Sequence, residues 1–200
     1  HLSCDADIPM RRPLSIMRAD AHAGWIEVLY KIVGVGLAAL SQRRAGDTLS
    51  VLGPIGRGFV PHGSHPRPLL IGGGVGIPPM VFLAEALHGD SSTAWKPLVV
   101  MGSEIPFPFR VRPSTILVPG MPSGVIACMP LLDDWGVPSR LSSLSGFAGC
   151  FDGYVTALAG QWLKSLDAAA RAEVEIFACG PTPMLEATAR LAKLHGLPCQ

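Results

Sequence analysis

The segment Leu69-Leu70-Ile71-Gly72-Gly73-Gly74-Val75-Gly76-Ile77-Pro78-Pro79 decides the fold of this 200-residue chain. The three apolar residues predict a short buried strand, and the prolines predict a helix over 79–87, since a first-turn residue needs no N–H. The glycines between them allow a backbone to approach a phosphate, and free N–H groups at a helix start favour negative charge. We therefore predict a dinucleotide loop, with a plain tight turn as the alternative because the spacing departs from G-x-G-x-x-G.

Apolar strands alternate with helices after this loop. Such strands between helices indicate a parallel sheet covered on both faces. We expect an α/β nucleotide-binding domain over 63–200. Its further strands are predicted at 98–101 and 174–178, with weaker candidates at 115–118 and 125–128, and its further helices at 154–172 and 182–195, the last one closed by Gly196.

The pattern before residue 62 is different. Short strands are predicted at 24–33 and 48–52, with Gly34 and Gly36 ending the first and a short helical piece at 37–43 between them. Residues 61–68 hold three prolines and predict a linker. Short strands joined by tight turns are typical of a β-barrel or sandwich, so we expect residues 1–62 to form part of such a domain.

A second strand also ends in a turn of small residues, Cys179-Gly180-Pro181, followed by a predicted helix. Ligands of an open α/β sheet bind at the carboxyl ends of its strands, so this turn and the glycine loop are expected to face one ligand. The alternative for Cys179 is a small buried apolar residue.

Composition excludes several classes of protein. Hydrophobic residues make up 48% and charged residues 16%, which predicts a folded core, and a net charge of +1 gives no field for nucleic acid. We expect no membrane span, because no apolar run reaches about 18 residues, and no signal peptide. The five cysteines form no C-x-x-C pair and His62 and His65 lack a third ligand, so no metal site is predicted; the odd cysteine count favours a reducing cytoplasm.

A third segment, Arg12-Pro13-Leu14-Ser15, combines a guanidinium fork for phosphate with a hydroxyl, although alone it is typical of any surface loop. In chain order it is followed by Leu29-Tyr30-Lys31, Gly34-Val35-Gly36, Gly53-Pro54-Ile55-Gly56-Arg57-Gly58-Phe59, the glycine loop and Cys179-Gly180-Pro181-Thr182-Pro183-Met184. This order resembles the ferredoxin–NADP reductase superfamily over nearly the whole chain. More narrowly, it resembles the electron-transfer subunits of dihydroorotate dehydrogenase.

The resemblance implies a partial antiparallel FAD-binding β-barrel followed by a parallel NAD-binding α/β domain. It implies that Arg12 contacts the flavin phosphates, that Ser15 lies beside the redox-active nitrogen of the isoalloxazine, and that Cys179 lies near the nicotinamide. Ser15 and Cys179 are thus the expected catalytic residues. The other implied FAD-binding residues are Pro13, Leu14, Leu29, Tyr30, Lys31, Gly36 and Leu37, and those for NAD(H) are Gly72, Gly73, Gly74, Gly76, Gly180, Pro181 and Met184.

The sequence departs from the family in three ways. Leu37 stands where the family usually has a threonine, which removes one polar contact to FAD. The chain starts inside the family's barrel, and the family continues past a Gly-Leu-Pro-Cys-Gln segment into a cysteine-rich [2Fe–2S] domain whose ligands are not in this sequence. We therefore expect the chain to be a fragment of a longer protein.

The resemblance also implies a function. Hydride passes between NADH and FAD, and single electrons continue to an iron–sulfur centre and a dihydroorotate dehydrogenase catalytic subunit in pyrimidine biosynthesis. A flavin reductase subunit of a hydrogenase or of another NADH oxidoreductase is the alternative within this class. A non-catalytic nucleotide-binding module is the alternative outside it.

Some residues leave choices open. Glu104 follows a predicted strand and is a candidate for a hydrogen bond to a ribose hydroxyl, which favours NAD, while Arg110 and Arg112 keep NADP open. The segment Phe107-Pro108-Phe109 either lies over a nucleotide or forms an apolar loop fixed by proline. Asp133 and Asp134 are adjacent, so a catalytic pair of carboxylates is not expected.

Overall fold

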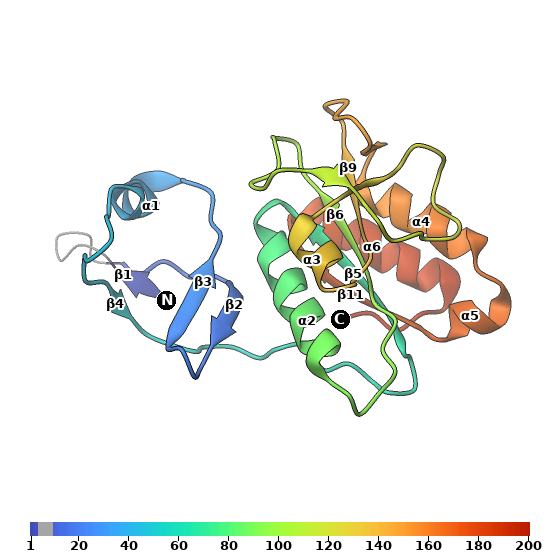
Figure 1. Ribbon diagram of the computed structural model, residues 1–200, viewed down its shortest axis with the longest axis horizontal. Coiled ribbons are helices and arrows are strands. Elements are labelled where there is room, and N and C mark those ends of the chain that lie inside the picture. Colours follow the sequence, from blue (N-terminus) through green and yellow to red (C-terminus); the bar gives the residue numbers. More distant parts are fainter. Residues whose placement is uncertain (4–9) are drawn as a thin grey trace. The chain divides into compact units, whose positions relative to one another are not determined.

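The computed structural model describes residues 1–3 and 10–200, and its elements are labelled in Figure 1. The chain divides into two compact units, His1–Gly58 and Phe59–Gln200. Every residue predicted for a cofactor lies in the described part. Of the five cysteines, Cys4 lies outside the described residues, and the other four are free thiols.

A five-stranded parallel sheet forms the centre of the second unit. Its order is β10-β9-β6-β5-β11, so β5 lies between the next strand in sequence and the last one. The chain therefore builds the sheet outward from β5 in one direction and adds β11 on the other side. The strands are β5 (Arg67–Gly73), β6 (Leu98–Gly102), β9 (Ser139–Ser143), β10 (Phe151–Asp152) and β11 (Val174–Cys179).

Helices cover both faces of this sheet (Figure 1). Helix α2 (Ile77–Gly89) packs on one face, and α4 (Val155–Ser165) with α6 (Thr182–His195) packs on the other. Alternate residues of β5 serve the two layers: Leu69 and Ile71 belong to the cluster that holds α4 and α6. The predicted parallel α/β domain is confirmed. Its remaining elements are η1 (Gly74–Gly76), β7 (Arg112–Pro113), β8 (Ala127–Cys128), α3 (Pro130–Asp134) and α5 (Ala168–Ala172).

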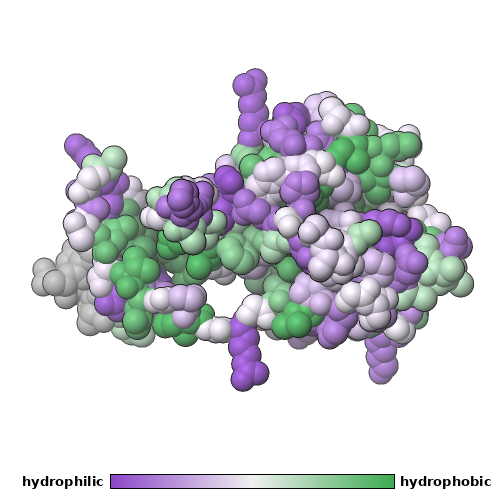
Figure 2. Space-filling view, turned by 60° about the horizontal axis from the view of Figure 1, so that its bottom comes forward, coloured by the Kyte–Doolittle hydropathy of each residue, from purple (hydrophilic) through white to green (hydrophobic). Residues whose placement is uncertain are grey.

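The first unit consists of two small antiparallel sheets and one helix, which confirms the predicted β character. Strand β1 (Leu2–Ser3) pairs with β4 (Ser50–Val51), β2 (Ile16–Asp20) pairs with β3 (Trp25–Val28), and the helix is α1 (Gly34–Ser41). Among its described residues only Met17 and Leu40 are buried apolar side chains. Apolar atoms are correspondingly visible on the surface of this unit in Figure 2.

Several element predictions were wrong in detail. The helix predicted over 154–172 is interrupted, because Leu166 is extended and the Asp167 carboxylate caps α5 by accepting the Ala170 N–H at 2.8 Å. No strand forms at 115–118. The predicted linker ends earlier, at the start of β5, and α1 already contains Gly34 and Gly36, which were expected to precede a helix. Gly196 does close α6, with φ of 64°.

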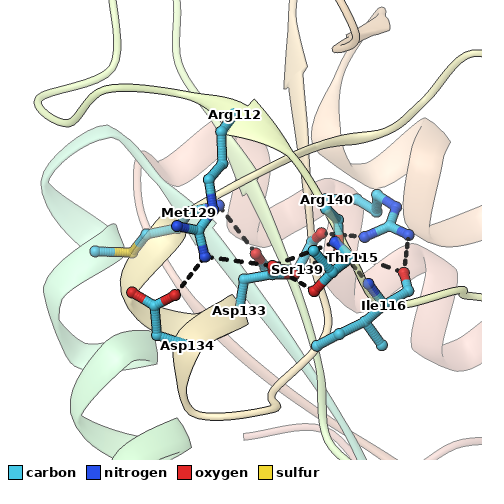
Figure 3. A network of polar contacts seen from close by, with 9 residues as sticks. Arg112, Thr115, Ile116, Met129, Asp133, Asp134, Ser139 and Arg140 are labelled. Carbon is cyan, nitrogen blue, oxygen red and sulfur yellow. Dashed lines mark hydrogen bonds and ion pairs between the residues drawn. The ribbon is translucent and has the colours of Figure 1, made fainter.

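A network of polar contacts holds the segment around residues 112–116 onto the second unit (Figure 3). The Asp133 carboxylate, 1% exposed, accepts hydrogen bonds from the Ser114 hydroxyl at 2.7 Å and from the Thr115 N–H and hydroxyl at 3.2 and 2.9 Å. Arg112 contacts both Asp133 and Asp134. Arg140 donates to the Ile116 carbonyl at 2.6 Å. These carboxylates therefore serve the fold, and Asp133 and Asp134 do not face each other across a reaction site.

This network predicts a pH dependence of stability. Burial raises the pKa of Asp133, but the hydrogen bonds from Ser114 and Thr115 outweigh it and hold that pKa below its ordinary value. A depressed pKa gives stability that is present above the unfolded-state pKa and is lost as the pH falls through the folded-state value. We expect the urea midpoint, followed by tryptophan fluorescence, to fall below about pH 4 more steeply in the wild type than in Asp133→Asn. Equal pH slopes in the two proteins would contradict this role of the carboxylate.

Candidate functional site

The glycine loop and the Cys179-Gly180-Pro181 turn lie at the same edge of the sheet. In the parallel register Cys179 is opposite Gly72, and Gly73 is opposite Gly102. This is also where the strand order reverses, because β6 and β11 flank β5 from opposite sides. Ligands of open α/β sheets bind outside the carboxyl ends of the strands at such a reversal.

The two loops interlock through their backbones. A side chain at Gly76 would overlap the carbonyl group of Cys179 and come within 2.6 Å of the Gly180 nitrogen. Gly73 and Gly180 both lie against Met184, whose sulfur would be 2.5 Å and 3.0 Å from a Cβ at those positions. Packing therefore leaves no room for a side chain at Gly73 or Gly76. Met184 packs against both loops through these contacts.

Two helices begin directly at these loops. Helices α2 and α6 have no side-chain cap at their N-termini and no acidic residue in their first turns. Few first-turn N–H groups remain for a ligand, because Pro78, Pro79 and Pro183 carry none, the Ile77 N–H donates to the Gly74 carbonyl, and the Met184 N–H donates to the Pro181 carbonyl at 2.9 Å. What the two helix starts offer an anion is the positive end of each helix dipole. Gly74 is exposed, with φ of 54° and no atom within 4 Å of the space a side chain would take. The loop can thus meet a phosphate through its backbone.

The thiol of Cys179 is half-buried at the end of β11. Burial raises its pKa, so the group is a neutral thiol at pH 7 and a poor nucleophile. Covalent catalysis through a thiolate is not supported by this environment. The position at the loop junction suits a residue that contacts a bound ring through its small, polarizable sulfur.

The loops after β6 and β9 contact each other beside this edge. The Ser145 hydroxyl donates to the Glu104 carbonyl at 3.2 Å, and the buried Phe107 ring lies 5.4 Å from Phe109 and 6.4 Å from Phe147. The Glu104 side chain is exposed, and its role toward a ribose stays a prediction. Phe107 serves as an anchor of its loop, which leaves Phe109 as the more accessible ring. Phe147 was not predicted to belong to this group, because no residue near it in the sequence indicates a contact with Phe107, 40 residues earlier.

The first unit holds a second group of predicted residues. Arg12 donates to the Met10 carbonyl at 2.8 Å, and its guanidinium covers Gly36 in the first turn of α1, where a Cβ would be 2.5 Å from Nε. Arg12, Gly36 and Leu37 line one shallow pocket of about 10 Å³. Helix α1 has no side-chain cap and no acidic residue in its first turn. A guanidinium beside an uncapped helix start is a setting that suits a phosphate.

The other predicted residues of this unit adjoin Arg12 or precede α1 along the chain. Pro13, Leu14 and the exposed Ser15 connect Arg12 to β2. Leu29, Tyr30 and Lys31 run from the end of β3 toward α1, with Tyr30 half-buried and Lys31 exposed. The Leu37 side chain has no polar group, so the pocket lacks the hydrogen-bond donor that a threonine at this position would supply.

No metal ligand set is found in residues 1–3 and 10–200, where no three His, Cys, Asp or Glu side chains gather. His62 instead lies with Nδ1 2.9 Å from Glu175 Oε1. None of the helices in these residues is long and apolar enough to cross a membrane.

Comparisons with curated proteins find relatives named as electron transfer subunits of dihydroorotate dehydrogenase B (NAD(+)). The chain is 30% identical over 188 residues, 93% of its length, to the electron transfer subunit of dihydroorotate dehydrogenase B (NAD(+)) of Geobacillus sp. (strain WCH70). It is 31% identical over 185 residues, 91% of its length, to the subunit of that name from Listeria welshimeri. The chain spans 62% and 61% of these two relatives. No family model matches the chain.

Solved structures with the same fold include reductases. The ferredoxin reductase in carbazole 1,9a-dioxygenase matches with a TM-score of 0.72 and 22% identity, covering 98% of this chain and 55% of that one. The cytochrome b5 reductase domain of Ulva prolifera nitrate reductase matches with a TM-score of 0.68 and 17% identity, covering 98% and 79%. At these identities the likeness establishes the fold. Over the length that it covers, the chain is therefore similar in sequence to the dihydroorotate dehydrogenase B electron transfer subunits, and it has a ferredoxin reductase-like fold.

Proposed function

We propose that this chain is the nucleotide-binding and flavin-binding part of a reductase that passes electrons between NAD(H) and FAD. The observation that carries the proposal is the interlocked pair of loops, in which Gly76 packs on the Cys179–Gly180 peptide between two uncapped helix starts. The carboxyl edge of a parallel sheet, beside the positive ends of two helix dipoles, suits the pyrophosphate of a dinucleotide. The sequence relatives are named as NAD(+)-dependent electron transfer subunits, which supports this ligand.

The proposed roles divide between the two units. In residues 63–200, Gly72, Gly73, Gly74 and Gly76 approach the pyrophosphate, while Gly180, Pro181 and Met184 shape the nicotinamide side beside Cys179. Glu104 accepts a ribose hydroxyl. In residues 1–62, Arg12 and Gly36 hold the FAD phosphates, and Pro13, Leu14, Leu29, Tyr30, Lys31 and Leu37 line the rest of the flavin.

Bound FAD supplies the two-electron to one-electron conversion, and the protein supplies binding and orientation. Ser15 donates its hydroxyl proton in a hydrogen bond toward the flavin nitrogen that gains charge. The neutral thiol of Cys179 contacts the nicotinamide ring without a covalent step. No general base is needed for a hydride that moves directly between two rings.

The further route of the electrons is part of the same proposal. The relatives are subunits of dihydroorotate dehydrogenase B, so we propose a catalytic subunit of that enzyme as the partner and pyrimidine biosynthesis as the setting. An iron–sulfur centre on this route takes its ligands from outside these 200 residues, because the five cysteines are widely spaced. The free thiols of the four described cysteines suit the reducing cytoplasm.

The decisive experiment is a spectrum of the purified whole protein followed by anaerobic addition of NADH. The proposal expects flavin absorbance that bleaches on mixing with NADH. A colourless protein that takes up no added FAD overturns the proposal and leaves a nucleotide-binding module without electron transfer.

Ser15→Ala tests the role of that hydroxyl. Losing a donor aimed at developing charge should slow flavin reduction at saturating NADH about tenfold or more, while the Kd for NADH stays within about twofold. The measurement is stopped-flow absorbance, with Ser123→Ala, an exposed serine of the second unit, as the matched control. A wild-type reduction rate in Ser15→Ala would remove Ser15 from the mechanism.

A further inference from the structure

Residues 59–62, the first of the second unit, contact β11 and residue Gln200, which pairs with β11 through its backbone. The Phe59 ring packs edge-to-face on Phe177, with centroids 5.6 Å apart at 82°. Val60 exchanges two hydrogen bonds with the Gln200 side chain, at 3.1 Å and 2.7 Å. We call this set the linker clamp; it consists of Phe59, Val60 and His62 on one side and Phe177, Gln200 and Glu175 on the other.

Glu175 is the centre of the linker clamp. Its carboxylate, 1% exposed, accepts the His62 N–H at 3.0 Å, lies 2.9 Å from His62 Nδ1, and accepts Gln200 Nε2 at 2.9 Å. Burying a carboxylate costs several kcal/mol unless donors surround it. Burial raises the pKa of Glu175, but the bonds from Gln200 and His62 outweigh it and keep that pKa below its ordinary value. Both hydrogen-bond partners of this buried charge, His62 and Gln200, belong to the clamp.

Gln200 reaches the clamp because its backbone pairs with β11. Its N–H donates to the Ile176 carbonyl at 2.9 Å, and its carbonyl accepts the Ala178 N–H at 3.0 Å. This pairing positions the side-chain amide of Gln200 so that it accepts the Val60 N–H and donates to the Val60 carbonyl, as the backbone of a neighbouring strand would. The clamp thus rests on the sheet that also carries the glycine loop.

The chain immediately before the clamp has the opposite character. Residues 51–58 are all exposed. Gly56 has φ of 117°, and neither Gly56 nor Gly58 has any atom within 4 Å of the space a side chain would take. Glycine leaves the backbone the widest choice of conformations. The backbone of the connection is therefore unrestrained by packing up to residue 58, and it is held by contacts with β11 from Phe59 onward.

We propose that the linker clamp confines the pivot between the two units to residues 53–58, and that Glu175 is a positioning residue for electron transfer. This inference rests on the proposed function, because a hydride passes only between rings that are held about 3–3.5 Å apart. A looser connection widens the range of approaches and slows the transfer. Nucleotide binding itself, which uses loops at the other end of β11, is unaffected.

Glu175→Gln tests the proposal with almost no change of volume. An amide nitrogen would replace one acceptor and face an N–H donor, so one or more clamp bonds must break. Glu173→Gln is the matched control. The Glu173 carboxylate lies just before β11 and also pairs with a cation, Arg67, at 2.7 Å, but this pair lies outside the linker clamp. Gln200→Ala is the second variant, which keeps the buried charge and removes both Val60 bonds.

Two readouts are needed in the whole protein. Hydrogen exchange of the peptide that contains Val60 and His62 should accelerate about tenfold in Glu175→Gln and Gln200→Ala, and not in Glu173→Gln. Flavin reduction at saturating NADH should slow about tenfold in the same two variants, with the Kd for NADH within about twofold. Unchanged exchange in Glu175→Gln and Gln200→Ala overturns the clamp, and faster exchange with an unchanged reduction rate overturns the positioning role. A wild-type protein that reduces no flavin defeats the proposed function, while the exchange experiment still decides whether the clamp exists.

Discussion

Replacing Gly76 by alanine should destabilise the second unit by about 3 kcal/mol and weaken NADH binding about a hundredfold. The added methyl overlaps the Cys179 carbonyl, which is backbone and cannot turn aside as a side chain would. The two loops must therefore separate, and the backbone of the glycine loop and the positive end of the α2 dipole move away from the edge of the sheet where the dinucleotide is proposed to bind. Loss of one charge-assisted hydrogen bond from the loop backbone, about 1.5–3 kcal/mol, accounts for an effect of this size on affinity.

Urea unfolding and a fluorescence titration with NADH measure the two effects of Gly76→Ala. The neighbouring Val75→Ala is the control, because Val75 is 56% exposed and its truncation leaves the loop junction intact. Its stability and its Kd for NADH should stay near those of the wild type. A Gly76→Ala protein with normal affinity would show that the junction of the loops does not form the dinucleotide site.

Replacing Arg12 by alanine should weaken FAD binding about a hundredfold, near the upper limit of about 3 kcal/mol for a charge-assisted hydrogen bond. The guanidinium covers Gly36 at the start of α1, and among the described residues that line this pocket Arg12 alone is positively charged, so its removal takes that charge away from a bound phosphate. Arg12→Lys should recover only part of the affinity, because an ammonium cannot form the bidentate contact.

Flavin retained during dialysis of the whole protein measures the effect of Arg12→Ala. Arg11→Ala is a strict control: Arg11 carries the same charge one residue earlier, yet it donates to the Ser50 carbonyl at 3.0 Å and the Ser50 hydroxyl at 2.7 Å. Its removal should loosen β4 and leave flavin affinity within about threefold. Equal losses from the two variants would mean that net charge alone holds the flavin.

The two loops of the second unit could be predicted because their signals are local. A buried strand, small residues and proline at a helix start stand next to one another in residues 69–79 and again in 176–184. The carboxyl-end rule then placed both loops at one edge of the sheet. The backbone contact of Gly76 with Cys179 was out of reach, because it depends on how far α2 and α6 lie apart.

Strand β9 was missed because its stability comes from distant partners. Four of the residues Ser139-Arg140-Leu141-Ser142-Ser143 are polar, and all five are buried. Ser139 accepts the Met129 N–H at 3.1 Å, and Ser142 donates to the Gly153 carbonyl at 3.0 Å. Hydrophobic periodicity detects only strands that bury apolar side chains, so it does not predict a buried strand of polar residues.

The linker clamp was missed for a related reason. His62 and Glu175 are 113 residues apart. From the sequence, His62 was considered only as a possible metal ligand. A histidine in a proline-rich segment carries no local sign of a buried carboxylate. The error at Leu166 has another cause. The periodicity of apolar residues continues through Leu166, but the Asp167 side chain caps a new helix at the next position.

The pairing of residues 198–200 along β11 also bears on how the protein behaves at high concentration. The outer N–H groups of Ile176 and Ala178 donate to the Pro198 and Gln200 carbonyls, at 2.9 and 3.0 Å. The strand at the opposite border of the sheet, β10, is only two residues long. Open sheet borders are templates on which neighbouring molecules add strands and aggregate. Because one border is occupied and the other is short, self-association of the second unit by strand addition is disfavoured on both sides.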